Sequence, residues 1–228
     1  MNDTFKRPIL SFVTRNGRSS VAQKRALENH WANYGLDCPQ EITPFDFSTL
    51  FNTHIAPILE IGFGMGHSLL QQALQAPSQP FVGIEVHEPG VGKLLNEATK
   101  HELKNLRIFK INAIEVLNKA IGNNSLSGVQ LFFPDPWHKT RHHKRRLVQI
   151  DFVKLIAQKL KPSGIFHMAT DWVEYADHMK AVLKQSPDFK AVEPTQLAEL
   201  IAQRPKTKFE NRGIRLGHVI TDLAYLKL

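Results

Sequence analysis

Cysteine is nearly absent from this chain of 228 residues, in which Cys38 is the only one. A single cysteine cannot form a disulfide within the chain, which excludes a disulfide-stabilised secreted scaffold and indicates a reducing compartment. Cys38 also lies far upstream of every motif discussed below. A catalytic thiol is therefore not expected.

Long hydrophobic runs are also lacking. No segment approaches the roughly 20 apolar residues that a membrane span requires, and the opening MNDTFKRPIL has no signal-peptide core. With 42% apolar residues and a mean hydropathy of −0.26, the composition is typical of a globular protein with a sizeable core. We expect a cytoplasmic protein that does not bind membranes, either monomer or homodimer, with no obligate protein partner.

Acidic residues are scarce relative to basic ones. The chain has 21 Asp and Glu against 29 Lys and Arg, a formal net charge of +8, and a pI near 9.6. Such a balance favours an acidic partner such as nucleic acid, although basic proteins without one are common. Residues 1–50 are weakly periodic, and the first 25 hold six cationic residues against one acid. We interpret them as a basic extension, partly mobile until a partner orders it, before a domain of residues 51–228.

From Ile55 onward, short runs rich in β-branched and aromatic residues alternate with longer stretches of helical spacing. The short runs are IAPILEIGF, FVGIEV, LRIFKIN, GVQLFFP and GIFHMAT. This alternation predicts an α/β fold: a Rossmann-like, doubly wound sheet of about seven strands, mostly parallel, with helices on both faces. DFKAVEP and HVITDLAYLKL would add an antiparallel pair at the sheet edge. RPKTKFENRGIR, between them, is interpreted as a basic loop.

The first predicted strand runs into EIGFGMG, with Gly62, Gly64 and Gly66 at every second position. Glycines there allow a sharp turn and a close approach to a ligand. A dinucleotide-binding fingerprint would place its third glycine at position 67, which is His67. The spacing after an acid indicates S-adenosylmethionine instead, and a plain strand–helix turn is the simpler alternative.

Polar side chains follow the ends of the first four predicted strands: Glu60, Glu85, Asn112 with Ala113, and Asp135. In open α/β sheets, ligands bind outside the carboxyl ends of the strands, where an acid after the second strand accepts from ribose hydroxyls. Asn112 and Ala113 could meet an adenine edge. Each acid alone could be a surface charge, but three acids and an amide in register at four strand ends predict one crevice.

The stretch FFPDPWHKTRHHKRR holds Asp135 between two prolines that restrict the backbone on either side. Phe133 and Trp137 offer faces for stacking. Cations and histidines follow: His138, Lys139, Arg141, His142, His143, Lys144, Arg145 and Arg146. Such density attracts a polyanion backbone. The histidines lack the acid-backed spacing typical of zinc, so no metal is expected.

This stretch resembles the signature of the tRNA (guanine-N7)-methyltransferase family, in its bacterial, single-chain form. SFVTRNGR, EIGFGMG, GIEVHEPGVG, DWVEYA and RPKTKFENRG resemble the family's other blocks, so the match extends from about Ser11 to Gly213. One departure is Asn112, where an aspartate is also usual. The resemblance implies methyl transfer from S-adenosylmethionine to guanine N7, at position 46 in the variable loop of tRNA.

The resemblance also implies roles for individual residues. Asp135 matches the catalytic aspartate. The cofactor positions are Glu60, Gly62, Gly64, Gly66, Glu85, Asn112, Ala113 and Asp135; the substrate positions are Lys139, Asp171, Thr207, Lys208, Phe209 and Glu210. We further assign tRNA backbone contacts to Arg15, Arg18, Arg141, Lys144, Arg145 and Arg146, with a disordered N-terminal tail as the alternative for the first two.

Guanine N7 carries a lone pair and no proton, so neither a strong base nor a covalent nucleophile is required. Orientation can supply roughly 7–11 kcal/mol, and a carboxylate can stabilise the charge that develops. Asp171 or Glu210 is expected to read the base edge while Phe209 or Trp137 stacks on it. An ordinary helix start, with Asp171 as N-cap, is the simpler interpretation of DWVEYA.

Three other functions stay open at this point. They are methylation of another RNA, a small molecule or a protein; RNA binding by a non-catalytic module with a degenerate glycine loop; and, more distantly, a nucleotide-dependent oxidoreductase. The basic rim disfavours a small-molecule substrate, and the run of strand-end acids disfavours the non-catalytic module.

Overall fold

The computed structural model describes Ser11 and residues 19–228. In these residues seven strands form one sheet in the order β3-β2-β1-β4-β5-β7-β6. The strands are β1 (Ile58–Ile61), β2 (Phe81–Ile84), β3 (Leu106–Phe109), β4 (Leu126–Phe132), β5 (Leu160–Thr170), β6 (Phe189–Ala191) and β7 (Thr221–Lys227). All neighbouring pairs are parallel except those of β7, which runs antiparallel to both β5 and β6. The predicted fold class is confirmed.

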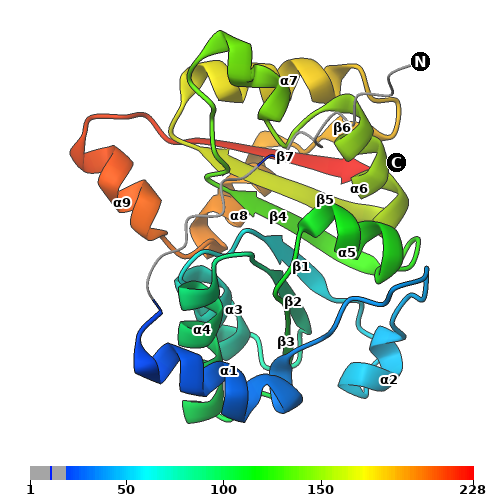
Figure 1. Cartoon of the computed structure of the whole chain (residues 1–228). Helices are drawn as coiled ribbons and strands as arrows, with labels where there is room; N and C mark the ends of the chain where they lie inside the picture. Colours follow the sequence, from blue (N-terminus) through cyan, green and yellow to red (C-terminus); the bar gives the residue numbers. More distant parts are fainter. Residues whose placement is uncertain (1–10, 12–18) are drawn as a thin grey trace, which may run out of the picture.

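Helices cover both faces of the sheet (Figure 1). In chain order they are α1 (Val21–Tyr34), α2 (Phe47–Phe51), α3 (His67–Gln75), α4 (Glu88–Lys100), α5 (Ala113–Lys119), α6 (Ile150–Lys159), α7 (Val173–Lys184), α8 (Pro194–Gln203) and α9 (Lys208–Arg215), with a 3-10 turn, η1 (Thr140–Arg145). One core lies under α1, α3 and α4, and the other under α5, α6 and α7. Both layers are hydrophobic because the central strands are buried on both sides.

The chain reverses its direction of winding between β1 and β4, which lie side by side at the centre of the sheet. Glu60 pairs in register with Gly83 on one side and Gln130 on the other. In doubly wound sheets this switch point opens a crevice at the carboxyl ends of the strands. The fold therefore places the glycine loop after β1 and the Asp135 loop after β4 at the same opening.

Residues 19–50 pack on the domain more closely than the sequence suggested. Ser20 and Gln23 form a capping box at the start of α1, and Tyr34 at its end donates a hydrogen bond to the Ala98 carbonyl of α4 at 3.0 Å. Phe47 belongs to the same buried core as Leu59 and Ile61. The domain boundary at residue 50 stays a prediction. Arg15 and Arg18 lie outside the described residues.

Two local predictions were wrong. RPKTKFENRGIR is not a loop throughout, because Thr207 and Glu210 form a capping box that starts α9. Figure 1 shows α9 outside the two helix layers, at the side of the molecule to which β4 points. The N-cap of α7 is Trp172 rather than Asp171, and no side chain caps that helix. None of the helices in the described part of the chain is long and apolar enough to cross a membrane.

Candidate active site

The glycine loop after β1 adopts a backbone that favours glycine. Gly62, Gly64 and Gly66 have φ of 73°, 56° and 76°, in the left-handed region. A Cβ on Gly66 would lie 2.9 Å from the Leu94 Cβ, whereas one on Gly62 would meet nothing within 4 Å. Gly66 is thus required by packing, and Gly62 leaves open space for a ligand.

Helix α4 presses directly on this loop. A Cβ on Gly90 would lie 1.9 Å from the Gly64 carbonyl oxygen, so any larger residue at position 90 would displace the loop. Gly90 stands in the quoted block GIEVHEPGVG but was not singled out from the sequence. The helix start and the loop therefore form one rigid unit.

Glu85, after β2, organises the same region. Its carboxylate is buried and accepts three backbone N–H groups: Gly64 at 2.7 Å, Val86 at 2.7 Å and His87 at 2.8 Å. Oε1 accepts two of these bonds and Oε2 one, so Oε2 retains a lone pair that could accept from a hydroxyl. Glu85 thus serves the loop as well as any ligand.

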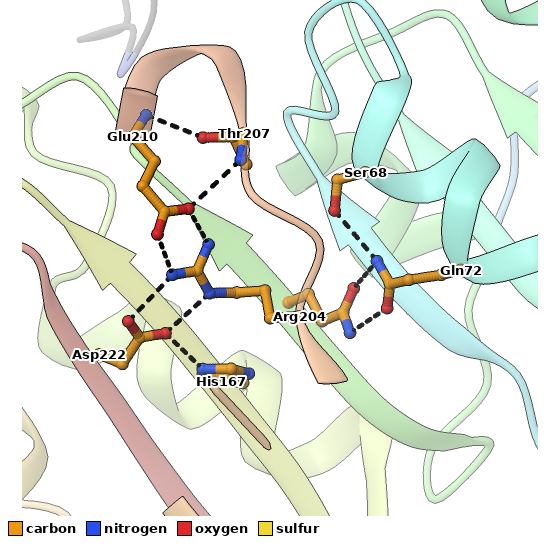
Figure 2. Close-up of polar contacts among 8 residues, drawn as sticks. Ser68, Gln72, His167, Arg204, Thr207, Glu210 and Asp222 are labelled. Carbon is orange, nitrogen blue, oxygen red and sulfur yellow. Dashed lines mark hydrogen bonds and ion pairs between the residues drawn. The ribbon is translucent and has the colours of Figure 1, made fainter. Parts of the chain in front are cut away.

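Glu60 lies beneath the loop and is 3% exposed. Burial, together with the negative charge of Glu85, raises the pKa of Glu60 to about 8, although the positive charge of Arg204 counteracts the shift. Gln72 of α3 donates to Glu60 Oε2 at 3.4 Å. Gln72 also donates to the Ser68 hydroxyl at 3.2 Å (Figure 2). Gln72 and Gln130 also exchange two amide hydrogen bonds of 3.1 and 2.7 Å. A buried carboxyl with so few donors is a good receptor for a cationic group.

Asn112 is the N-cap of α5 and accepts from the Ile114 N–H at 3.0 Å through Oδ1. Ala113 is the first residue of that helix. Because Oδ1 is used in the cap, the Asn112 Nδ2 hydrogens are the donors that could reach an adenine ring nitrogen.

The Asp135 loop is held in an unusual backbone. Phe133 and Trp137 have φ of 53° and 50°, values that non-glycine residues rarely adopt. Asp135 itself is exposed. The Trp137 indole is covered by the Arg145 guanidinium at 3.7 Å and donates to the Ser11 carbonyl at 3.1 Å. The chain thus fixes Trp137, two residues after an accessible carboxylate.

A cavity of about 310 Å³ joins the glycine loop to the start of α9. Its lining includes Glu60, Gly62, Gly64, Phe133, Thr207, Lys208 and Phe209. Phe209 is 60% exposed. The cavity lining does not include Glu85, Asn112, Asp135 or Asp171, which stand on neighbouring loops. A larger hollow of about 420 Å³ lies between α1 and the chain after β3, away from the glycine loop.

Asp171 follows β5 and faces α9. Its carboxylate accepts from His218 Nδ1 at 3.1 Å and is only partly buried. A Cβ on Gly213 would lie 2.9 Å from Asp171 Oδ2, so glycine is required where α9 passes this acid.

Glu210 lies in a different environment, within a buried ionic cluster (Figure 2). Arg204 donates to Glu210 at 2.7 and 3.2 Å and to Asp222 at 2.9 and 3.1 Å. His167 contacts Asp222 at 2.9 Å, and Glu210 Oε2 also accepts from the Thr207 N–H at 3.3 Å. Asp222 is kept ionised: burial alone would raise its pKa, but the hydrogen bonds from His167 and Arg204 outweigh burial and lower it. With both oxygens engaged, Glu210 is not available to a base edge in this conformation.

The cationic stretch after Asp135 divides by exposure. Lys139, Arg141 and Lys144 are exposed on and beside η1. Arg146 is 4% exposed, and its Nε donates to the Pro136 carbonyl at 2.9 Å. The side chain of Arg146 is thus enclosed in this conformation, and its expected contact with the tRNA backbone stays a prediction.

The comparisons with known proteins agree with this geometry. Residues 56–223 match the family model described as "Putative methyltransferase". The tRNA (guanine-N(7)-)-methyltransferase of Alkalilimnicola ehrlichii is 51% identical over 225 residues, covering 98% of this chain and 94% of the relative. That of Pasteurella multocida is 50% identical over 226 residues, covering 98% and 87%. The chain belongs to the tRNA (guanine-N(7)-)-methyltransferase family.

Solved structures show the fold alone. The aminoglycoside resistance methyltransferase NpmB1 aligns with a TM-score of 0.54 at 12% identity, covering 82% of this chain and 95% of that one. The 16S rRNA methyltransferase KamB aligns with 0.54 at 16% identity, over 82% and 95%. Family membership thus rests on the sequence relatives.

Sequence reasoning had missed two parts of this family member's site. The sequence did carry a signal for Gly90, because a glycine is unusual in the first turn of a helix that starts with Glu88 and Pro89. The Arg204 cluster had no such signal, because its members lie far apart in the sequence. Asp222 is 18 residues from Arg204 and 55 residues from His167. Among the described residues no group of three or more His, Cys, Asp or Glu could hold a metal ion.

Proposed function

We propose that this protein transfers a methyl group from S-adenosylmethionine to N7 of guanine in tRNA, at position 46 of the variable loop. The observation that carries the proposal is about 50% identity to tRNA (guanine-N(7)-)-methyltransferases of several bacteria over 97–98% of the chain. The aligned region covers the glycine loop, the Asp135 loop and α9 together.

The described residues fit S-adenosylmethionine. The open space at Gly62 lets the cofactor approach the backbone closely. The carboxyl of Glu60, which is buried and has few hydrogen-bond donors around it, suits the ammonium group of the cofactor. The remaining lone pair of Glu85 Oε2 suits a ribose hydroxyl, and Asn112 with Ala113 suits the adenine edge. When bound, this cofactor supplies an electrophilic methyl group on its sulfonium.

The chain's own task is positioning. Guanine N7 attacks with an existing lone pair, so no residue has to remove a proton, and holding the reacting atoms in line supplies most of the rate. Asp135, exposed on a fixed loop, stabilises the positive charge that develops on the ring. Asp171, partly exposed beside α9, binds the base edge. Glu210 is paired with Arg204 and has a structural role beside the site.

Exposed groups around the cavity bind the remainder of the substrate. Phe209 offers its ring to the base, and Thr207 and Lys208 flank it. Lys139, Arg141, Lys144 and Arg145 contact the tRNA backbone, and Arg15 and Arg18 do the same from the N-terminal segment. This distribution makes affinity dependent on salt.

The test uses purified protein, methyl-labelled S-adenosylmethionine, and tRNA transcripts that carry guanine or adenine at the variable-loop position. Borohydride–aniline treatment then cuts the chain at 7-methylguanosine. Cleavage at that guanine alone is expected. Label without cleavage would retain a methyltransferase but refute N7, and no label with bound cofactor would refute the substrate.

Asp135→Asn is the companion variant. The side chain is exposed, so folding should be unchanged, while kcat should fall by about 10²-fold if the charge matters in the transition state. Full turnover of this variant would remove Asp135 from the mechanism.

A further inference from the structure

The loop that carries Asp135 is strained on both sides. Phe133 and Trp137, two residues before and two after Asp135, have φ of 53° and 50°. Such a backbone is unfavourable for residues other than glycine, and it persists only where surrounding contacts impose it. The contacts that impose it therefore determine where the carboxylate stands.

Arg146 makes one of these contacts from a buried position. Its side chain is enclosed, 4% exposed, although it ends a run of exposed cations. Nε donates to the Pro136 carbonyl, next to Asp135, at 2.9 Å. Nη2 lies 3.1 Å from His143 Nε2, and because arginine has no acceptor, His143 must accept this bond.

The guanidinium of Arg146 also packs against a buried aromatic ring. Its guanidinium lies 5.0 Å from the centroid of the Tyr175 ring, which is fully buried in α7. The Tyr175 hydroxyl accepts from the Val148 N–H at 3.3 Å. Arg146 thus connects the Asp135 loop to the core beneath α7, in a planar arrangement that a lysine cannot reproduce.

We propose that Arg146 is a positioning residue for Asp135, which acts through the Pro136 carbonyl and not through the tRNA. The inference rests on the proposed function, since it concerns the residue that stabilises charge on guanine. The proposal gives Arg146 a different role from Arg141 and Lys144, the exposed cations of the same stretch. Small displacements of a reacting geometry cost as much as about 10²-fold in rate.

A double-mutant cycle between Arg146→Met and Asp135→Asn tests the proposal. Arg146→Met alone should lower kcat by about 10-fold or more, with the KM for tRNA and its salt dependence little changed. In the Asp135→Asn background the same substitution should have almost no further effect on kcat, because the group it positions is gone. Arg146→Lys takes its place in the cycle if the methionine variant does not fold.

Lys159→Met is the matched control. Lys159 is also a buried cation, 7% exposed, bonded to Asn123 at 3.0 Å, but it precedes β5 at the opposite end of the sheet. It should lower the melting temperature and leave kcat unchanged. If Arg146→Met behaves the same way, or if its kcat loss is additive with Asp135→Asn, the positioning role is refuted. A raised KM with a shallower salt dependence would make Arg146 a phosphate contact and also refute it.

Hydrogen exchange provides a readout that does not require methylation. Arg146→Met should accelerate exchange of the amides from Phe133 to His138, and Lys159→Met should not. If the wild-type protein failed to methylate guanine, the proposed function would fall, while exchange would still decide whether Arg146 holds this loop. Unchanged exchange would contradict the proposal.

Discussion

Arg204→Met should be the most damaging single substitution of a cationic side chain in the C-terminal part of the fold. The Arg204 side chain is 3% exposed, and its partners Glu210 and Asp222 are 8% and 4% exposed. Methionine fills much of the volume but leaves two buried carboxylates without their cation. Removing one partner of a buried ion pair typically costs about 3–5 kcal/mol, which for a domain of this size is roughly 6–20 °C in melting temperature.

The pH dependence of this loss distinguishes charge from packing. In the wild type, hydrogen bonds from His167 and Arg204 outweigh burial and lower the pKa of Asp222. That contribution to stability is present above the unfolded pKa of the carboxyl and is lost as pH falls through the folded value. Without Arg204, burial is less well opposed, so Asp222 takes up a proton more easily. The stability difference between variant and wild type should therefore be smaller at about pH 5 than at about pH 8.

Chemical denaturation of both proteins at the two pH values measures this difference. Arg215→Met serves as control, because Arg215 is an exposed arginine of the neighbouring helix and should change stability by less than about 0.5 kcal/mol. A loss for Arg204→Met below about 1 kcal/mol, or a loss independent of pH, would refute the electrostatic argument.

The remaining predictions concern the cofactor loop and the basic surface. Gly90→Ala places a methyl group 1.9 Å from the Gly64 carbonyl, so it should weaken S-adenosylmethionine binding in calorimetry at least 10-fold, on the order of the 1–3 kcal/mol cost of overpacking. Burial and Glu60's acidic neighbour raise the pKa of Glu60 from 4.5 to about 8. The ligand-free protein should therefore lose stability progressively as pH rises from about 4.5 to about 8 and level off above that, while cofactor affinity should rise over the same range. Arg141→Met and Lys144→Met should each make the dependence of log tRNA affinity on log salt shallower by about 1.

Each of these predictions has a control or a result that would contradict it. Gly122→Ala meets nothing closer than 3.6 Å, so equal losses in the two alanine variants would contradict the steric argument for Gly90. Glu60→Gln should abolish the pH trends in stability and in affinity, and their survival would point to another group. An unchanged salt slope would exclude Arg141 or Lys144 from the phosphate contacts.

The sheet could be predicted from sequence because its signals are local. Strands β1 to β4 are short, mostly buried runs bounded by Gly, Pro or Asn, and β2 is buried at all four positions. The glycine loop and the strand-end acids follow from the same pattern, because parallel strands bring their carboxyl ends to one edge. These elements needed no knowledge of partners distant in the chain.

The elements that were missed have weak periodicity. Helix α9 buries only Glu210 and Gly213 and therefore lacks an apolar stripe. The sequence TKFE nevertheless matches the capping-box pattern that Thr207 and Glu210 form. Helix α1 likewise begins with a capping box at Ser20 and buries only Ala26 and Tyr34.

The ionic cluster and the burial of Arg146 could not be predicted. Register places Asp222 opposite Ala169 on β5, two positions from the pair of His167 and Ala224, and the contact between Asp222 and His167 spans 55 residues of chain. Likewise, nothing in the run HHKRR distinguishes the one arginine that turns inward. Burial of a charged side chain depends on partners that the local sequence does not contain.

The direction of β7 has a practical consequence for handling the protein. Because β7 runs against its neighbours, Leu228 emerges at the edge where the parallel strands begin, and it is 65% exposed. Ser11, in contrast, accepts from the indole of Trp137 beside Asp135. A purification tag or a fluorescent reporter fused after Leu228 is thus carried on the side away from the crevice. The same addition before Ser11 would be brought to its mouth, where it would compete with a large polyanionic substrate.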